Sequence, residues 1–271
     1  MISVVTFKWK PRPGYRSKFT SEHVNTLAAM VARHYRSPHR FICITDDPTG
    51  LEVEHYPLWD TYSDMRNPTW PEGPSCFRRL RVFDRTFASI AGPRFICLDL
   101  DMVITGDVTP LFDRPEPFLM MRTHLPHIPL CGSMFMMNAG VHQEVWDDFA
   151  RNPAAAIAAM QKAGCRGSDQ AWMTYRLGTK VPGWGNEDGV YSYMQLAPRI
   201  GKRRGVGAFQ YTPKLAKLPE GARIVIFTGK PDPWDKEALD VAPWIREHYH
   251  RRPPVGPERR AGGDAGALGV G

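Results

Sequence analysis

Hydrophobic and polar positions follow strand and helix periods over the first part of the chain. Residues 2–9 alternate between apolar and polar side chains, which is typical of a strand. A helix follows, capped by Thr20 or Ser21, because apolar residues then recur every three or four positions. Residues 41–45 form a short apolar run, and residues 51–56 predict a third strand. A strand, a helix and a strand in this order predict a parallel sheet with a crossover helix, and so an α/β fold.

Helix and strand patterns continue along most of the chain. Residues 77–90 carry apolar side chains at helical spacing, and the arginines of this segment, Arg79 among them, are expected elsewhere on the helix. Residues 62–75 are rich in Pro, Asn and Trp without a period, so they predict a loop. Further strands are predicted at 118–121, 133–137 and 223–227, a helical turn at 109–113, and helices at 141–150, 153–163, 169–177 and 244–249.

Two carboxylates stand directly after a short apolar run. The run ends at Leu98, is rich in β-branched and aromatic residues, and leads into Asp99 and Asp101. Residues i and i+2 of a strand point to the same face, so both carboxylates are expected together at the end of a core strand. Paired carboxylates repel each other and lose solvation unless a cation or a donor compensates. The pair therefore fits either a divalent-metal site or a strand end that caps a turn.

Length, composition and charge limit these interpretations. The chain has 271 residues, 42% of them hydrophobic and 23% charged, which is ordinary for a folded protein of one large or two small domains. No apolar run approaches the roughly 20 residues of a membrane span, and we expect no signal peptide. Five scattered cysteines without a CxxC pair favour a cytoplasmic protein over a disulfide framework or a zinc module. The net charge of +7 favours acidic partners: phosphorylated ligands, nucleic acid or an anionic membrane surface, which leaves peripheral membrane contact open.

Several polar segments at strand ends and helix starts occur in a distinctive order. Each has a structural explanation by itself, since Asp169 suits the first turn of a helix and Gly140 suits a cap. In chain order they are Phe77-Arg78-Arg79-Leu80, Asp99-Leu100-Asp101, Pro110-Leu111-Phe112-Asp113, Asn138-Ala139-Gly140-Val141, Asp169-Gln170 and Ile226 to Trp234. Taken together, this ordered set resembles the glycogenin and galactosyltransferase-type family of GT-A glycosyltransferases, over most of the chain up to Trp234.

The resemblance implies a fold and an activity. The fold is a single GT-A domain over residues 1–250, Rossmann-like, with a central mixed, mostly parallel sheet flanked by helices, followed by a flexible basic tail at 251–271. The activity is transfer of a hexose from a nucleotide-diphosphate sugar, foremost a UDP-sugar, with retention of anomeric configuration. The acceptor is left open between a glycan, a lipid, a protein and a small molecule.

The resemblance also implies roles for individual residues. Asp99 and Asp101 would hold Mn²⁺ or Mg²⁺ on the donor diphosphate, as their hard oxygen ligands suit either ion. Asp169 and Gln170 would be the catalytic pair beside the anomeric carbon. The residues expected to bind the donor are Phe7, Lys8, Tyr15, Asp46, Arg79, Leu100, Asn138, Gly140, Gly229 and Lys230.

The sequence departs from the family pattern near its end. Ile226 stands where the family has a histidine that is a third metal ligand. The family lysine that contacts the donor diphosphate falls on Asp232, and we expect Lys230, two residues earlier, to supply that charge. A family lysine on the earlier helix is Arg79 here, which keeps the charge and changes its geometry.

Acceptors of this family are read by variable loops. Here those loops are residues 62–75, 124–132 and 181–193, and their aromatic residues Trp70, Trp184 and Tyr191 either stack on a sugar or pack locally.

Two other functions fit parts of the sequence. Asp99-Leu100-Asp101 also resembles the nucleophile motif of haloacid-dehalogenase phosphohydrolases, although a strand–helix–strand unit precedes it here. The loss of the histidine at Ile226 and the basic C-terminal part favour a non-catalytic protein that binds nucleotide sugars or nucleic acid on a GT-A core.

Overall fold

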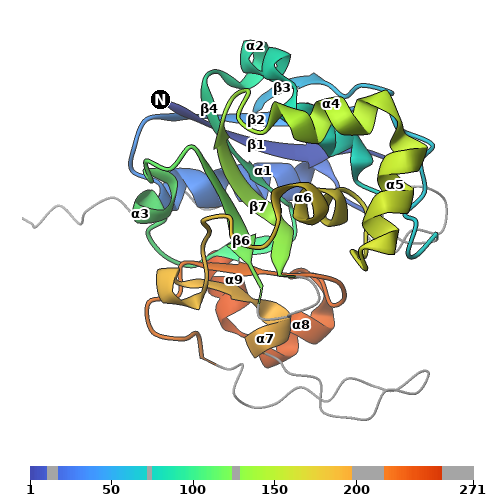
Figure 1. Ribbon diagram of the computed structural model, residues 1–271. Coiled ribbons are helices and arrows are strands. Elements are labelled where there is room, and N and C mark those ends of the chain that lie inside the picture. The colour runs from blue at the N-terminus through green and yellow to red at the C-terminus, as the bar shows by residue number, and fades with distance from the viewer. Residues whose placement is uncertain (11–17, 72–74, 124–128, 197–216, 252–271) are drawn as a thin grey trace, which may run out of the picture.

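A mixed six-stranded sheet forms the centre of the computed structural model (Figure 1). The structure describes residues 1–10, 18–71, 75–123, 129–196 and 217–251, so Tyr15 lies outside the described residues. The strands follow the order β3-β2-β1-β4-β7-β6. Their bounds are Ile2–Lys8 for β1, His39–Thr45 for β2, Glu54–Pro57 for β3, Arg94–Leu98 for β4, Phe118–Arg122 for β6 and Leu130–Asn138 for β7.

Strand direction divides this sheet into two halves. β1, β2, β3 and β4 run parallel to one another, so their carboxyl ends meet at one edge of the sheet. β7 runs antiparallel to both β4 and β6. The predicted α/β fold with a mixed, mostly parallel central sheet is therefore confirmed.

Helices cover both faces of the sheet. Alternate strand residues separate into two cores, with Val4 and Ile96 in the one that contains α1 and Val5 and Phe95 in the one that contains η1 and α4 to α6. Their bounds are Ser21–His34 for α1, Phe77–Phe83 for η1, Arg85–Phe87 for η2, Ala88–Ala91 for α2, Thr109–Phe112 for α3, Gln143–Arg151 for α4, Pro153–Lys162 for α5 and Asp169–Leu177 for α6. Within the part of the chain that the structure describes, no helix is long and apolar enough to cross a membrane.

A second, three-stranded sheet lies below the first in Figure 1. It is built from β5 (Met102–Ile104), β9 (Ile224–Ile226) and β8 (Val190–Ser192). β9 runs antiparallel to β5 and parallel to β8. The short helices around it are η3 (Asn186–Asp188), α7 (Tyr193–Leu196), α8 (Lys236–Val241) and α9 (Trp244–His248). The chain thus leaves the central sheet after Leu98 and enters the second one at Met102, so Asp99 and Asp101 lie between the two sheets.

The helix predicted at 77–90 is wrong in its form. Residues 77–83 and 85–87 are 3₁₀ turns, the extended backbone of Asp84 separates them, and only Ala88–Ala91 is α-helical. Three residues per turn align Phe77, Leu80 and Phe83 on one face, and all three are buried. Arg79 is buried as well, with 7% of its surface exposed, so the expectation that it lies away from the core is also corrected.

Candidate functional site

The paired aspartates lie where the central sheet gives way to the smaller one. The Asp99 N–H donates to the Ser133 carbonyl at 2.9 Å, and the Phe227 N–H donates to the Asp101 carbonyl at 2.9 Å. Both side chains are half-buried, whereas Leu100 between them is 2% exposed and belongs to the core. The side chain of Leu100 packs inward, so it does not line the site as expected.

Arg79 joins this strand end to the start of α6. Its Nη1 donates to Asp99 Oδ1, and its Nε and Nη2 lie 2.8 Å and 2.6 Å from Asp169 Oδ2. The side chains of Arg79 and Asp169 are 8% and 5% exposed, so this is a buried ion pair. The other oxygen of Asp169 accepts from the Ser168 hydroxyl at 3.2 Å. Segments that are far apart in the sequence are thus held together by charge in a site of low solvent access.

Burial and the neighbouring charges act in opposite directions on the pKa of Arg79, and also on the pKa of Asp99. Burial acts to lower the pKa of Arg79, but the carboxylates of Asp169 and Asp99 outweigh it and raise that pKa well above its ordinary value. Burial raises the pKa of Asp99, and its contact with Arg79 offsets only part of that rise. The guanidinium is therefore a permanent positive charge at this point of the site.

The first residues of β7 pack against Arg79 and Gln170. The Gly132 N–H donates to Gln170 Oε1 at 3.2 Å, which fixes the orientation of the Gln170 amide. A Cβ at Gly132 would come within 3.0 Å of Arg79 Nη2 and 3.1 Å of the Gln170 Cβ, so no larger residue fits there without movement. The sequence predicts Gly132 only as the last residue of the loop 124–132, because a glycine beside an apolar run carries no signal of a buried contact.

Asn138 and Gly140 do not join the aspartates. Because β7 runs antiparallel to β4, Asn138 pairs with Arg94 at the start of β4, while Ser133 contacts Asp99. Five strand residues at roughly 3.3 Å each separate these two levels by about 16 Å. Asn138 instead accepts a hydrogen bond from Arg94, and Gly140 follows it in a turn with φ 82°. The structure therefore does not bring these two residues to the aspartates, because only parallel strands bring their carboxyl ends to one edge.

The ends of β1 and β2 form another part of the same edge. Lys8 pairs with Thr45 in the parallel register, so Asp46 follows directly beside it. Asp46 accepts from the Lys10 N–H with both carboxylate oxygens, at 3.1 Å and 3.2 Å. Lys8 is 6% exposed and Phe7 is 9% exposed, with the Phe7 ring packed edge-on against neighbouring aromatic rings. Phe7 and Lys8 are therefore mostly buried, so they stabilise this edge of the sheet more than they line its surface.

The turn after β9 carries Gly229 and Lys230. Gly229 has φ 100°, a conformation that glycine adopts without strain. Lys230 Nζ donates to the carboxylates of Asp232 at 2.7 Å and of Asp235 at 2.9 Å. Burial acts to lower the pKa of Lys230, and these two carboxylates outweigh it, so the pKa is raised. Lys230 therefore keeps its charge, but much of that charge is balanced within its own turn.

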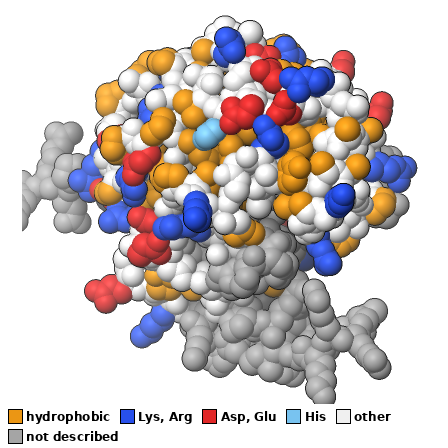
Figure 2. Space-filling model, in the orientation of Figure 1, with side chains coloured by type: hydrophobic (Ala, Val, Ile, Leu, Met, Phe, Trp, Pro, Cys, Tyr) orange, Lys and Arg blue, Asp and Glu red, His pale blue; other side chains and the backbone are white. Residues whose placement is uncertain are grey.

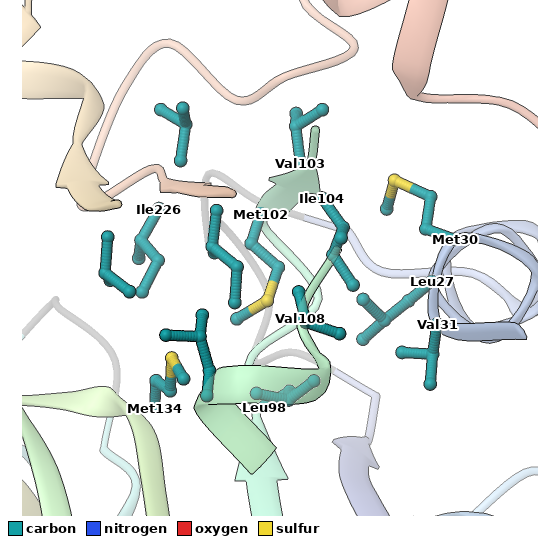
Figure 3. Close-up of a cluster of buried hydrophobic side chains, with 14 of the residues drawn as sticks. Leu27, Met30, Val31, Leu98, Met102, Val103, Ile104, Val108, Met134 and Ile226 are labelled. Atoms are coloured by element: carbon teal, nitrogen blue, oxygen red, sulfur yellow. The ribbon is translucent and has the colours of Figure 1, made fainter. Parts of the chain in front are cut away.

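The residues fit a divalent cation only in part. Asp99 and Asp101 offer hard oxygen ligands of the kind that Mg²⁺ and Mn²⁺ prefer. Ile226 is fully buried in the hydrophobic cluster of Figure 3, where it pairs with Met102. Among the described residues, no group of three or more His, Cys, Asp or Glu side chains is arranged to hold a metal ion. A cation at this pair would thus draw its remaining ligands from a bound substrate and water.

The described residues carry no net positive charge that would favour nucleic acid or an anionic membrane surface. Of the 35 Lys and Arg residues, 25 are described, and 25 of the 28 Asp and Glu residues are described, so this part of the chain has no net charge. The face shown in Figure 2 mixes acidic, basic and hydrophobic side chains. The whole excess of +7 belongs to segments outside the described residues.

The chain is similar in structure to known glycosyltransferases. No family model matches the sequence, and no curated protein matches it. The apo form of the glycosyltransferase GlyE from Streptococcus pneumoniae TIGR4 matches with a TM-score of 0.50 and 15% identity, over 87% of this chain and 56% of GlyE. The galactosyltransferase LgtC, in complex with donor and acceptor sugar analogues, matches with a TM-score of 0.54 and 9% identity, over 92% of this chain and 97% of LgtC.

A third solved structure matches over a similar share of the chain. The bifunctional glycosyltransferase WbbM matches in its apo form with a TM-score of 0.51 and 12% identity, over 93% of this chain and 51% of WbbM. The chain therefore spans little more than half the length of GlyE and WbbM and nearly all of LgtC. At these identities the likeness establishes the fold, which is the GT-A fold.

Proposed function

We propose that this chain is a glycosyltransferase that moves a hexose from a nucleotide-diphosphate sugar, foremost a UDP-sugar, to an acceptor. The observation that carries the proposal is the contact of the buried Arg79 with both Asp99 and Asp169 at the carboxyl edge of the sheet. A buried ion pair is costly to form, and in our proposal its charges serve the sugar and the leaving group of the donor.

Asp169 acts by position and charge in this proposal. It is 4% exposed, and both of its oxygens are engaged by Arg79 and Ser168, which leaves it poorly placed to attack the donor. Fixed in this way, it provides negative charge near an anomeric carbon that becomes positive as the leaving group departs. Gln170, held by the Gly132 N–H, orients sugar hydroxyls. The proposal includes retention of anomeric configuration, and its only basis is the resemblance of the sequence to the glycogenin and galactosyltransferase-type family.

The donor diphosphate is placed beside Asp99 and Asp101. A bound Mn²⁺ or Mg²⁺ held there would neutralise charge on the nucleoside diphosphate as it leaves. The nucleoside is placed at the ends of β1 and β2, near Lys8 and Asp46, where the parallel strands open the edge of the sheet. Lys230 contributes less than an unpaired lysine would, because Asp232 and Asp235 already contact it.

A non-catalytic nucleotide-sugar-binding protein is the second candidate, and Ile226 favours it. The buried isoleucine leaves two carboxylates for a cation, which weakens a metal-assisted departure of the nucleotide. A haloacid-dehalogenase phosphohydrolase has less support, because its nucleophilic aspartate must be free to attack, whereas Asp99 contacts Arg79.

Release of UDP tests the proposal. Purified protein is incubated with Mn²⁺ and each of a panel of nucleotide sugars, including UDP-glucose and UDP-galactose, and free nucleotide is measured. We expect release from at least one donor, its loss in Asp101→Ala, and its retention in Asp147→Ala, a matched change at an exposed aspartate on α4. Tight UDP binding in calorimetry without turnover of any donor would leave the binding protein as the function. Neither binding nor release would reject both candidates.

A further inference from the structure

Trp70 is exposed in a way that the other tryptophans are not. All eight tryptophans lie among the described residues, and Trp70 alone is exposed, with 51% of its surface accessible. The other seven are half-buried or buried, Trp184 being completely buried. A large rigid ring left open to water contributes little to the fold itself, so its neighbours decide what it can bind.

Hydrogen bonds hold the backbone of the loop that carries Trp70 in place. Asn67 is 3% exposed, and its Oδ1 accepts from the Thr69 N–H at 2.9 Å and from the Trp70 N–H at 3.0 Å. The Gln161 Nε2 donates to the Pro68 carbonyl at 3.2 Å, which ties the loop to α5. An aromatic ring on a backbone held in this way loses little conformational entropy when a ligand stacks on it.

The same loop is bonded to the segment that leads into the site. Thr69 Oγ1 accepts from the Gly167 N–H at 3.0 Å, two residues before Asp169. After residues 72–74 the chain returns to this segment, where the Cys76 N–H donates to the Ser168 hydroxyl at 3.1 Å. The residue next to Trp70 is thus bonded to the segment that leads into Asp169.

The structure separates Trp70 from the other loop aromatics. The Trp184 indole N–H donates to the Leu111 carbonyl at 3.2 Å in the interior, so this ring packs locally. Tyr191 is half-buried in β8 of the smaller sheet. Of the three aromatic residues considered in the acceptor loops, Trp70 is the one with an exposed ring.

The surroundings of Trp70 match a sugar better than a lipid or an apolar peptide. Along the loop it is flanked by Pro68, Thr69 and Pro71, none of which is a large apolar residue. Among the described residues, the other exposed large hydrophobic side chains are Met1 and Tyr175, so the loop shows no run of such side chains around the ring. A lipid chain or an apolar peptide needs a contiguous apolar patch. A pyranose has one face of C–H groups and a rim of hydroxyls, so a single flat ring among polar groups suffices to hold it.

We propose that Trp70 is the stacking platform for a saccharide acceptor. The proposal rests on the proposed glycosyltransferase function and narrows its acceptor from a glycan, lipid, protein or small molecule to a glycan or other saccharide.

Binding of disaccharides tests the platform without requiring turnover. Lactose, maltose and cellobiose are titrated in the presence of UDP and followed by saturation-transfer NMR, with wild type, Trp70→Ala, Trp70→Phe and the control Tyr175→Ala. Tyr175 is another exposed aromatic residue, 39% accessible, on α6. We expect at least one disaccharide to bind, about tenfold more weakly in Trp70→Ala and less affected in Trp70→Phe, as loss of one stacked ring predicts. Tyr175→Ala should bind as wild type, and UDP affinity and melting temperature should be the same in all variants.

Each other outcome overturns the proposal. Failure of all three disaccharides to bind the wild type would reject a saccharide platform, and so would unchanged binding in Trp70→Ala. If a tyrosine-containing peptide or phosphatidylglycerol vesicles bind and lose affinity in Trp70→Ala, the occupant is a protein or a lipid and the saccharide assignment is wrong. The proposed function fails by a separate measurement, when no nucleotide sugar releases UDP although a disaccharide still binds at Trp70.

Discussion

Replacing Arg79 with methionine removes a guanidinium that contacts both the half-buried Asp99 and the buried Asp169. Methionine fills much of the volume of the arginine stem, so the main change is in charge. Asp169 then remains 4% exposed without the guanidinium that contacts it at 2.6 Å and 2.8 Å. The stability of Arg79→Met therefore reports directly on how strongly the fold depends on this network.

The expected loss is large because both partners are buried. Removing one member of a buried ion pair costs about 3–5 kcal/mol, chiefly for the charge left behind. The ion pair of Arg151 and Asp148 has a similar N–O distance of 2.8 Å, but Arg151 is 74% exposed. Arg151→Met should therefore lower the free energy of unfolding by less than about 0.5 kcal/mol.

Urea unfolding at neutral pH, followed by circular dichroism, measures these differences. Arg79→Met combined with Asp169→Asn removes the orphaned charge, so the double variant should recover part of the loss and be more stable than Arg79→Met alone. A loss below about 1 kcal/mol in Arg79→Met would mean that the Arg79–Asp169 pair behaves like an ion pair at the surface, contrary to its burial. If the double variant is no more stable than Arg79→Met, the loss does not come from the charge left on Asp169.

Three further outcomes follow from the structure. Gly132→Ala should reduce UDP release and cost about 1–3 kcal/mol in urea unfolding, since its Cβ meets Arg79 Nη2 at 3.0 Å; full activity would contradict this. Ile226→His should lower the melting temperature, because this position is buried in the core of Figure 3, and should not tighten Mn²⁺ binding in calorimetry; tighter binding would contradict the assigned position. Burial and Arg33 lower the pKa of His34 from 6.5 to about 4, so the folded state binds fewer protons than the unfolded state between these values, and stability falls as pH drops from 6.5 to 4. His34→Gln should remove up to about 1 kcal/mol of that pH dependence, after allowance for screening by water, and an unchanged pH profile in urea unfolding would contradict this.

The parallel half of the fold could be predicted from the sequence because its signals are local. The alternating pattern of residues 2–8, the helical spacing of α1 and the apolar run of β4 each fix an element without reference to the rest of the chain. The start of α6 could be predicted equally well, since Ser168 and Asp169 form a typical helix beginning.

The direction of β7 and the pairing of β5 with β9 could not be predicted. Apolar runs indicate strands without showing which way they run, so Asn138 was expected at the same edge as Asp99 and lies at the other. β5 and β9 are more than 100 residues apart, and their pairing depends on the complete fold. The burial of Arg79 could not be predicted either. It depends on the carboxylates of Asp99 and Asp169, which come later in the chain.

A crystal structure of the protein soaked with UDP and Mn²⁺ tests the central claim most directly. We expect UDP at the carboxyl ends of β1 and β2, with its diphosphate beside Asp99 and Asp101 and within reach of the Arg79 network. UDP bound elsewhere, or Mn²⁺ held by residues other than this pair, would contradict it.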